Sequence, residues 1–160
     1  MKLFSSEKFG TIHLICLLIL FIPIQARSEE QPSKVDQAIA LYEEGPSKAP
    51  EVIRLLEEAL KENPKNQKAM SLLGMTYFSI GEFEKALEQF DRAIARAKKR
   101  NDVAYEIMFY KARTLHELGF NGEAKSVLDA CWPFFQEEDA LLVQYKMLYS
   151  AVEAELEKKK

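Results

Sequence analysis

The chain has 160 residues, with 22 Lys and Arg against 25 Asp and Glu, so its formal net charge is −3. Nonspecific nucleic-acid binding relies on an excess of basic side chains along one face, so this mild acidity disfavours that function. There are two cysteines, Cys16 and Cys131. The first lies in a segment that we expect to be removed, so no disulfide within the mature chain is predicted.

Residues 1–28 have the features of an export signal. Two lysines precede an apolar run of about 13 residues, 12–24, and small residues follow at Ala26 and Ser28, where cleavage is expected. Residues 29–32 would then form a linker. A short uncleaved membrane anchor is the alternative, although a spanning helix normally needs about 20 apolar residues. We expect an exported protein, periplasmic or extracellular; an anchored chain would face the same side.

Seven helices are predicted in the rest of the chain. Apolar residues recur at three- and four-residue steps, Pro50 suits a first helical turn, and Pro64, Gly81 and Gly119 mark breaks. No segment alternates with a period of two for long enough to form a strand. The expected helices span residues 33–44, 50–62, 67–80, 82–99, 103–118, 122–132 and 137–157. The sequence therefore predicts an all-α fold.

A helical hairpin is repeated at a spacing of 34 residues. At this offset the paired residues are Ala40 with Gly74, Val52 with Ala86, Leu56 with Phe90 and Ala59 with Ala93. A third copy follows a four-residue insertion near 101–104, and it pairs Gly74 with Ala112, Gly81 with Gly119, Ala86 with Ala124 and Phe90 with Leu128. A fixed period of this length is typical of hairpins that stack on one another.

The middle copy carries the most complete pattern: Met70, Leu73, Gly74, Tyr77, Gly81, Phe83, Ala86, Phe90 and Ala93. It resembles a tetratricopeptide repeat (TPR). The first copy departs in its first helix, with Ala40 for the Gly and Glu43 for the Tyr. The resemblance implies a right-handed α-solenoid of about three helix-turn-helix repeats, followed by a capping helix. These parts are expected at residues 33–66, 67–100, 101–138 and 139–160.

Packing arguments favour the same fold. A glycine inside a helix costs about 1 kcal/mol relative to alanine, so Gly74 needs a reason, and close approach of a second helix supplies one. The last helix carries an apolar stripe, which we interpret as the face that caps the third hairpin. The stripe consists of Leu141, Leu142, Tyr145, Leu148, Tyr149, Val152 and Leu156. A partner-binding or dimerising helix is the alternative.

In TPR proteins the first helix of each hairpin lines a concave groove that holds a segment of another protein. The residues at matching positions here are Gln37, Leu41, Lys68, Ser71, Met75, Phe78, Phe109, Arg113 and His116. The basic clamp with which some members grip an acidic carboxyl end is absent. Its positions hold Gln37, Leu41, Ser71, Leu72, Glu106 and Tyr110. The resemblance therefore implies an apolar or amphipathic protein segment as the partner.

Each of these residues also has an ordinary explanation. Met75 and Phe78 are equally consistent with core positions, and Arg113 with His116 is consistent with an exposed polar face. His116 would be the one histidine of the mature chain, so no metal site is expected, and neither is a cofactor.

The sequence shows no phosphate-binding glycine loop and no nucleophile with a base, so it does not predict an enzyme. The expected function is a noncatalytic exported scaffold for protein–protein interaction, with no nucleic acid as partner. A membrane contact is expected only if the N-terminal segment stays uncleaved. The alternative is a structural subunit of a cell-envelope assembly, held by the C-terminal helix or by that anchor.

Overall fold

The computed structural model describes residues 32–99, 104–135 and 140–158. The chain divides into two units, Met1–Gln31 and Pro32–Lys160, and every described residue belongs to the second. The predicted export signal and most of the predicted linker thus lie outside the described residues. No helix of the described part is long and apolar enough to span a membrane.

The second unit is built from helices, and its described residues contain no strand. The α-helices are α2 (Lys34–Glu43), α3 (Ala49–Glu62), α4 (Gln67–Ser79), α5 (Phe83–Lys99), α6 (Tyr105–Glu117), α7 (Asn121–Cys131) and α8 (Leu142–Glu157). Two single turns of 3₁₀-helix, η2 (Pro46–Lys48) and η3 (Trp132–Phe134), were not predicted. The seven predicted helices are all present, so the all-α prediction is confirmed.

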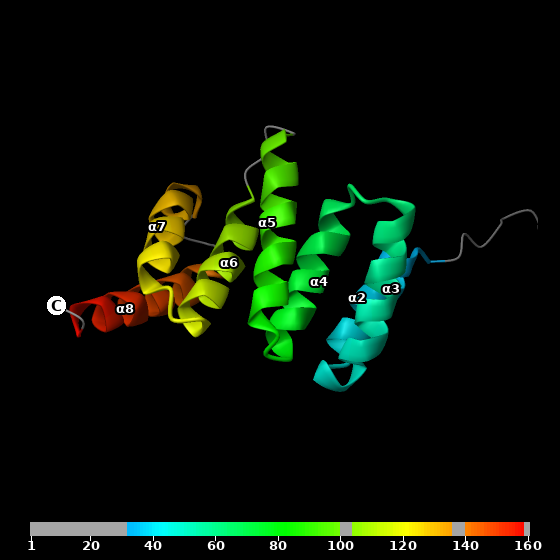
Figure 1. Ribbon diagram of the computed structural model, residues 1–160, viewed down its shortest axis with the longest axis horizontal. Coiled ribbons are helices and arrows are strands. Elements are labelled where there is room, and N and C mark those ends of the chain that lie inside the picture. The colour runs from blue at the N-terminus through cyan, green and yellow to red at the C-terminus, as the bar shows by residue number, and fades with distance from the viewer. Residues whose placement is uncertain (1–31, 100–103, 136–139, 159–160) are drawn as a thin grey trace, which may run out of the picture. The chain divides into compact units, whose positions relative to one another are not determined.

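Consecutive helices pair as hairpins, and the hairpins stack in chain order (Figure 1). α2 packs on α3, α4 on α5 and α6 on α7, while α3–α4 and α5–α6 contacts join neighbouring hairpins. This stacking of consecutive hairpins is an α-solenoid, as predicted. The boundary expected at 66/67 coincides with Asn66, the N-cap of α4. The boundaries expected at 100/101 and 138/139 lie outside the described residues.

The turns inside the hairpins follow from local chemistry. Gly81 and Gly119 have φ angles of 79° and 80°, in the left-handed region that glycine adopts without a Cβ clash. At the start of α4, the Asn66 side chain accepts a hydrogen bond from the backbone amide of Ala69 at 3.1 Å. Such a cap satisfies a donor that has no partner within the helix. These residues set where the helices begin and end.

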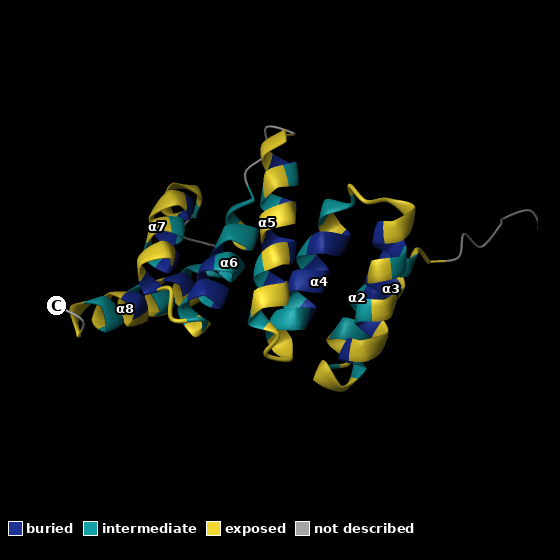
Figure 2. Ribbon diagram, viewed as in Figure 1, coloured by how far each residue is buried: buried dark blue, intermediate teal, exposed yellow. Residues whose placement is uncertain are grey.

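The buried residues lie where the helices face one another (Figure 2). One buried cluster contains residues of α2, α3, α4 and α5, and a second contains residues of α6, α7 and α8. Within the α4–α5 hairpin, a Cβ built on Gly74 would lie 2.7 Å from the ring of Phe90. That distance is shorter than a carbon–carbon contact allows, so the helices approach closely only because residue 74 has no side chain. The structure thus explains the helical glycine as expected.

The register of the first copy differs from the prediction. Ala38 is fully buried, whereas Ala40 is exposed, so Ala38 is the counterpart of Gly74. The offset is therefore 36 residues along α2, while Leu56 and Phe90 on the second helices keep the offset of 34. The reason is the turn, because five residues separate α2 from α3 and three separate α4 from α5. Two extra residues there move all of α2 out of the simple repeat.

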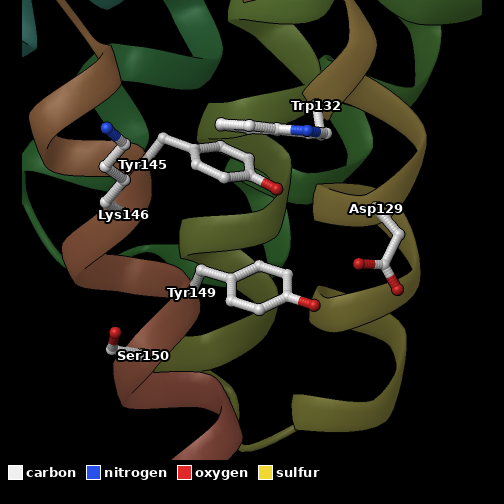
Figure 3. A pocket seen from close by; sticks show the side chains of 6 residues that line it. All are labelled: Asp129, Trp132, Tyr145, Lys146, Tyr149 and Ser150. Atoms are coloured by element: carbon white, nitrogen blue, oxygen red, sulfur yellow. The ribbon is translucent and has the colours of Figure 1, made fainter.

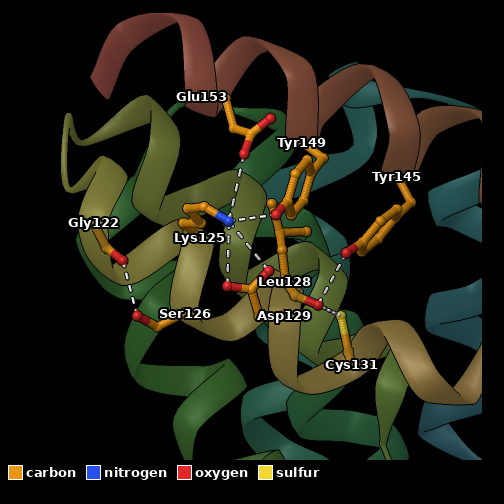
Figure 4. Close-up of polar contacts among 9 residues, drawn as sticks. All are labelled: Gly122, Lys125, Ser126, Leu128, Asp129, Cys131, Tyr145, Tyr149 and Glu153. Carbon is orange, nitrogen blue, oxygen red and sulfur yellow. Dashed lines mark hydrogen bonds and ion pairs between the residues drawn. The ribbon is translucent and has the colours of Figure 1, made fainter. Parts of the chain in front are cut away.

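α8 packs on the third hairpin, in agreement with a capping role. Tyr145 and Val152 are buried against α6 and α7. The Tyr145 hydroxyl donates to the Leu128 carbonyl at 3.1 Å, and burial raises the pKa of that hydroxyl (Figure 4). Lys125 of α7 donates to the Tyr149 hydroxyl of α8 and lies 3.6 Å from the Glu153 carboxylate. Apolar burial and polar contacts therefore both hold α8 in place.

Candidate binding face

The first helices of the three hairpins form one continuous face, because α4 contacts both α2 and α6. We call the surface of α2, α4 and α6 the first-helix face. Two contacts cross it: Lys68 of α4 lies 3.6 Å from Asp36 of α2, and the Arg113 guanidinium lies 4.7 Å from the centre of the Phe78 ring. A cation above an aromatic ring is attracted by the ring quadrupole. The face is therefore connected by side chains from different repeats.

The centre of the first-helix face is apolar. Met75 and Phe78 of α4 are half-buried, so neither is a fully covered core residue. The Phe78 ring centre lies 5.5 Å from that of Phe83, and Phe78 is still only partly buried. Ser71 is also half-buried and donates its hydroxyl to the Gln67 carbonyl at 2.9 Å. Lys68 is exposed at the edge.

The corrected register changes the residues that α2 contributes. With Ala38 equivalent to Gly74, the counterparts of Met75 and Phe78 are Ile39 and Tyr42, which are both half-buried. The predicted Leu41 is also half-buried, and it packs against the same core cluster as Ile39 and Tyr42. The predicted Gln37 is the counterpart of Leu73 and donates its side-chain amide to the Pro32 carbonyl at 2.7 Å. The corrected register therefore adds Ile39 and Tyr42 to this face, and the binding role of Gln37 and Leu41 stays a prediction.

Tyr42 lies close enough to α6 to sense its side chains. Burial raises the pKa of the Tyr42 hydroxyl, nearby Tyr110 raises it further, and Arg113 opposes the shift. Tyr42 also lines a cavity of about 170 Å³ with Pro46, Thr76 and Ser79, between α2, η2, α3 and α4. A recess bordered by an aromatic ring and hydroxyl groups suits an apolar side chain that carries a neighbouring polar group.

Phe109 was predicted to present its ring to a partner, and the structure contradicts this. Its exposed fraction is 0%, and its ring lies 5.5 Å from Tyr110 and 6.4 Å from Phe135. Phe135 in turn packs at 4.9 Å from Tyr145 of α8. The chain that follows the third hairpin therefore covers Phe109. In the last repeat, the segment that follows α7 packs on this side of α6, so Phe109 becomes a core residue.

His116 is half-buried and makes a local contact. Its Nδ1 lies 2.6 Å from the side-chain oxygen of Asn121, a buried residue at the start of α7. The contact spans the α6–α7 turn. His116, which was predicted to bind a partner protein, therefore makes a side-chain contact within its own hairpin. Among the described residues, no group of three or more His, Cys, Asp or Glu side chains could hold a metal ion.

Sequence reasoning missed Ile39 and Tyr42 as residues of the face, and it assigned Tyr110 only to the absent clamp. The signal for the first two was the small residue Ala38 and the long turn after α2, which contains Gly45 and Pro46. Tyr110 is half-buried and stacks at 6.3 Å from Phe90. With these three residues added, the first-helix face is more aromatic than predicted.

A second concave feature lies outside this face, between α7 and α8. Its cavity has a volume of about 420 Å³ and is lined by Asp129 and Trp132 from one side and by Tyr145, Lys146, Tyr149 and Ser150 from α8 (Figure 3). The Trp132 and Tyr145 rings are 5.2 Å apart, and Trp132 is 48% exposed. An exposed tryptophan beside a cavity marks a surface that can bury further apolar area.

Comparison with known proteins gives the same fold. A family model described as tetratricopeptide repeat matches residues 33–105. The type III secretion translocator chaperone SycD of Yersinia enterocolitica has a similar structure, with a TM-score of 0.66 at 17% identity, covering 79% of this chain and 83% of that one. A second SycD structure, in complex with a peptide of the translocator YopD, gives 0.66 at 16%, with 79% and 92% covered.

The TPR2B domain of yeast Sti1, in a complex with pHsp70, gives a TM-score of 0.64 at 17% identity, with 77% of this chain and 98% of that one covered. No curated protein matches the sequence. Residues 33–105 thus match the tetratricopeptide-repeat family, as the middle copy predicted, and the similar structures have the same fold. Its fold is that of a scaffold for protein–protein interaction.

Proposed function

We propose that this protein is an exported, noncatalytic scaffold that holds an apolar or amphipathic segment of another protein on its first-helix face. The observation that carries the proposal is the aromatic and apolar centre of that face, formed by Ile39, Tyr42, Met75, Phe78 and Tyr110. These side chains come from three successive repeats and stay half-buried, and Ile39, Tyr42 and Tyr110 pack at the edge of the core. Surfaces of this kind bind the apolar side of a peptide or helix.

The charges of the face support an uncharged or amphipathic ligand. Lys68 is paired with Asp36, and Arg113 lies on Phe78, so neither cation stands apart as a receptor for a carboxylate. Two of the similar structures hold peptide partners: a YopD peptide on SycD, and pHsp70 on the Sti1 domain. Those partners belong to those proteins. The use of a TPR fold to hold a polypeptide supports the same class of partner here.

Site-specific photocrosslinking tests the proposal. A benzophenone amino acid in place of Met75 should crosslink the partner in native cell envelopes, and the same residue at the exposed Ala130 of α7 should not. Phe78→Ser should abolish the Met75 crosslink while circular dichroism shows unchanged helicity. Ile80→Ser, which alters an exposed apolar residue at the end of α4, is the matched control. Equal crosslinking from residues 75 and 130 would exclude the first-helix face as the binding site.

Export is a separate part of the proposal, supported by the apolar run and the small residues that follow it. Intact-mass measurement of protein recovered outside the cytoplasm should show a chain that begins after Ala26 or Ser28. A full-length chain in the membrane fraction would favour the anchor.

A structural subunit of an envelope assembly is the second candidate. The observation that favours it is the apolar outer surface of α8, where Val143 and Met147 are exposed. In that case α8, and not the first-helix face, would carry the essential contact. Phe78→Ser would then leave assembly intact, whereas a charged residue at Met147 would disrupt it.

A further inference from the structure

α8 is the one α-helix of the described chain that lacks a hairpin partner, because α2 to α7 form three pairs. Its inner side, with Tyr145 and Val152, is buried on the third hairpin. Val143 and Met147 on the opposite side are 67% and 70% exposed. They are the most exposed large hydrophobic residues among those that the structure describes.

This outer side has the pattern of a helix-pairing surface. It consists of Val143, Met147, Ser150 and Ala154, and the steps of four, three and four residues place all of them along one side of α8. None carries a charge. Ser150 and Ala154 are small enough to let a second helix approach closely, while Val143 and Met147 supply apolar area. We call these four residues the outer stripe.

The charges beside the outer stripe indicate the direction of a second helix. Glu153 is paired with Lys125, and Glu155 lies 2.6 Å from Lys158. Lys146 and Glu157 have no ion pair within the described part of the chain. They lie eleven residues apart, which is about three helical turns, and so they share one flank of α8. The positive charge is near the start of the helix and the negative charge is at its end.

The last turn of α8 contains no basic residue, although Lys158 at its C-cap pairs with Glu155. Glu157 keeps a carboxylate without an ion pair, among the described residues, at the negative end of the helix dipole. An antiparallel neighbour would bring a positive helix start and Lys146 to that end. A parallel neighbour would instead place the acidic ends together.

We propose that α8 pairs in antiparallel fashion with α8 of a second copy of this chain. A two-fold axis near Ser150 and Ala154 places Lys146 of each copy beside Glu157 of the other and joins the two outer stripes. A two-fold interface needs complementary features on a single surface, and α8 carries both charges and the apolar stripe on its own. The pairing also covers the mouth of the α7–α8 cavity, since Lys146 and Ser150 line it (Figure 3).

The dimer uses no residue of the first-helix face, so it is independent of the proposed function. A pair of four-turn helices buries less area than a standard interface, so we expect a weak dimer, with self-association in the micromolar range. Sedimentation velocity of the full chain, purified in the processed form that cells accumulate, should show dimers between about 1 and 100 μM. Met147→Glu should weaken self-association at least about tenfold, because it buries a carboxylate in the outer stripe.

Ile80→Glu is the matched control, because Ile80 is an exposed apolar residue on a different helix end and should leave the dimer unchanged. Charge exchange tests whether the two α8 helices are antiparallel. Lys146→Glu and Glu157→Lys should each weaken the dimer, and the double variant should restore it. Trp132, the single tryptophan, reports on the cavity, and its emission should shift to shorter wavelength as dimers form.

Three results would overturn the proposal. The first is a protein that stays monomeric throughout the concentration range. This includes the case in which Trp132 emission shifts only when a different envelope protein is added. The second is a dimer that Met147→Glu leaves intact, and the third is a double charge variant as weak as the single ones.

Discussion

The α4–α5 hairpin and the α6–α7 hairpin solve the same packing problem with different residues. In the first, Gly74 has no side chain and the large ring of Phe90 fills the space. In the second, the equivalent positions hold Ala112, which adds a methyl group, and the smaller Leu128, and both are fully buried in one cluster. The comparison teaches that the repeat conserves the total volume at the seam and not the residue at either position.

The largest effect is expected when this volume is exceeded. Gly74→Leu must displace the Phe90 ring, since a Cβ alone already lies 2.7 Å from it. We expect a loss of about 3 kcal/mol of unfolding free energy, measured by urea denaturation. Ala112→Leu should behave in the same way if the two seams are equivalent. An unchanged midpoint for Gly74→Leu would refute the packing explanation.

A volume exchange sharpens the comparison. Gly74→Ala and Phe90→Leu should each cost about 1 to 2 kcal/mol, the first through overpacking and the second through a cavity. Together they recreate the Ala–Leu pair of the third hairpin. The double variant should be more stable than the sum of the single effects predicts, by about 1 kcal/mol in a double-mutant cycle. Strict additivity would show that the two residues do not share one space.

The C-terminal part adds polar contacts that the middle hairpin lacks. Tyr145→Phe removes the hydrogen bond to the Leu128 carbonyl and should cost about 1 kcal/mol in thermal or chemical unfolding. Tyr77→Phe is the control, because that hydroxyl lies 3.3 Å from Glu57 at the surface and should cost less than about 0.5 kcal/mol. Equal costs would mean that α8 is held by apolar burial alone.

The smallest expected effect is a pH dependence at Cys131. Burial raises the pKa of this thiol from 9.0 to about 11. Above pH 9 the unfolded chain loses the thiol proton and the folded chain keeps it, so stability falls between about pH 9 and pH 11. We expect Cys131→Ala to reduce that fall by about 1 kcal/mol, with Ala93 of the second copy showing that alanine fits the position. Identical pH profiles would place the thiol in contact with solvent.

The middle copy was predictable because its signals are local. Within one hairpin, packing space explains the residue types at Gly74, Ala86 and Phe90, and backbone conformation explains Gly81. The helix ends followed from glycine, proline and caps for the same reason.

The candidate face was only partly predictable. The family pattern gave Met75 and Phe78 on α4, which are half-buried, but it did not give Ile39 and Tyr42 on α2, because two extra residues in the α2–α3 turn shift that helix. Phe109 fits the pattern of a groove residue, yet Phe135 and α8 cover it. The long turn with Gly45 and Pro46 was a local signal for the shift, whereas no residue of α6 signals the cover.

Hydrophobic periodicity and the spacing of small residues determined that this chain forms stacked helical hairpins, since those signals act between residues within a few turns of one another. Tertiary structure decided which side chains of α2 and α6 remain accessible, and it left the outer stripe of α8 uncovered by the other described helices. Exposure depends on contacts between residues far apart in the chain, and a two-residue change in one turn is enough to alter them.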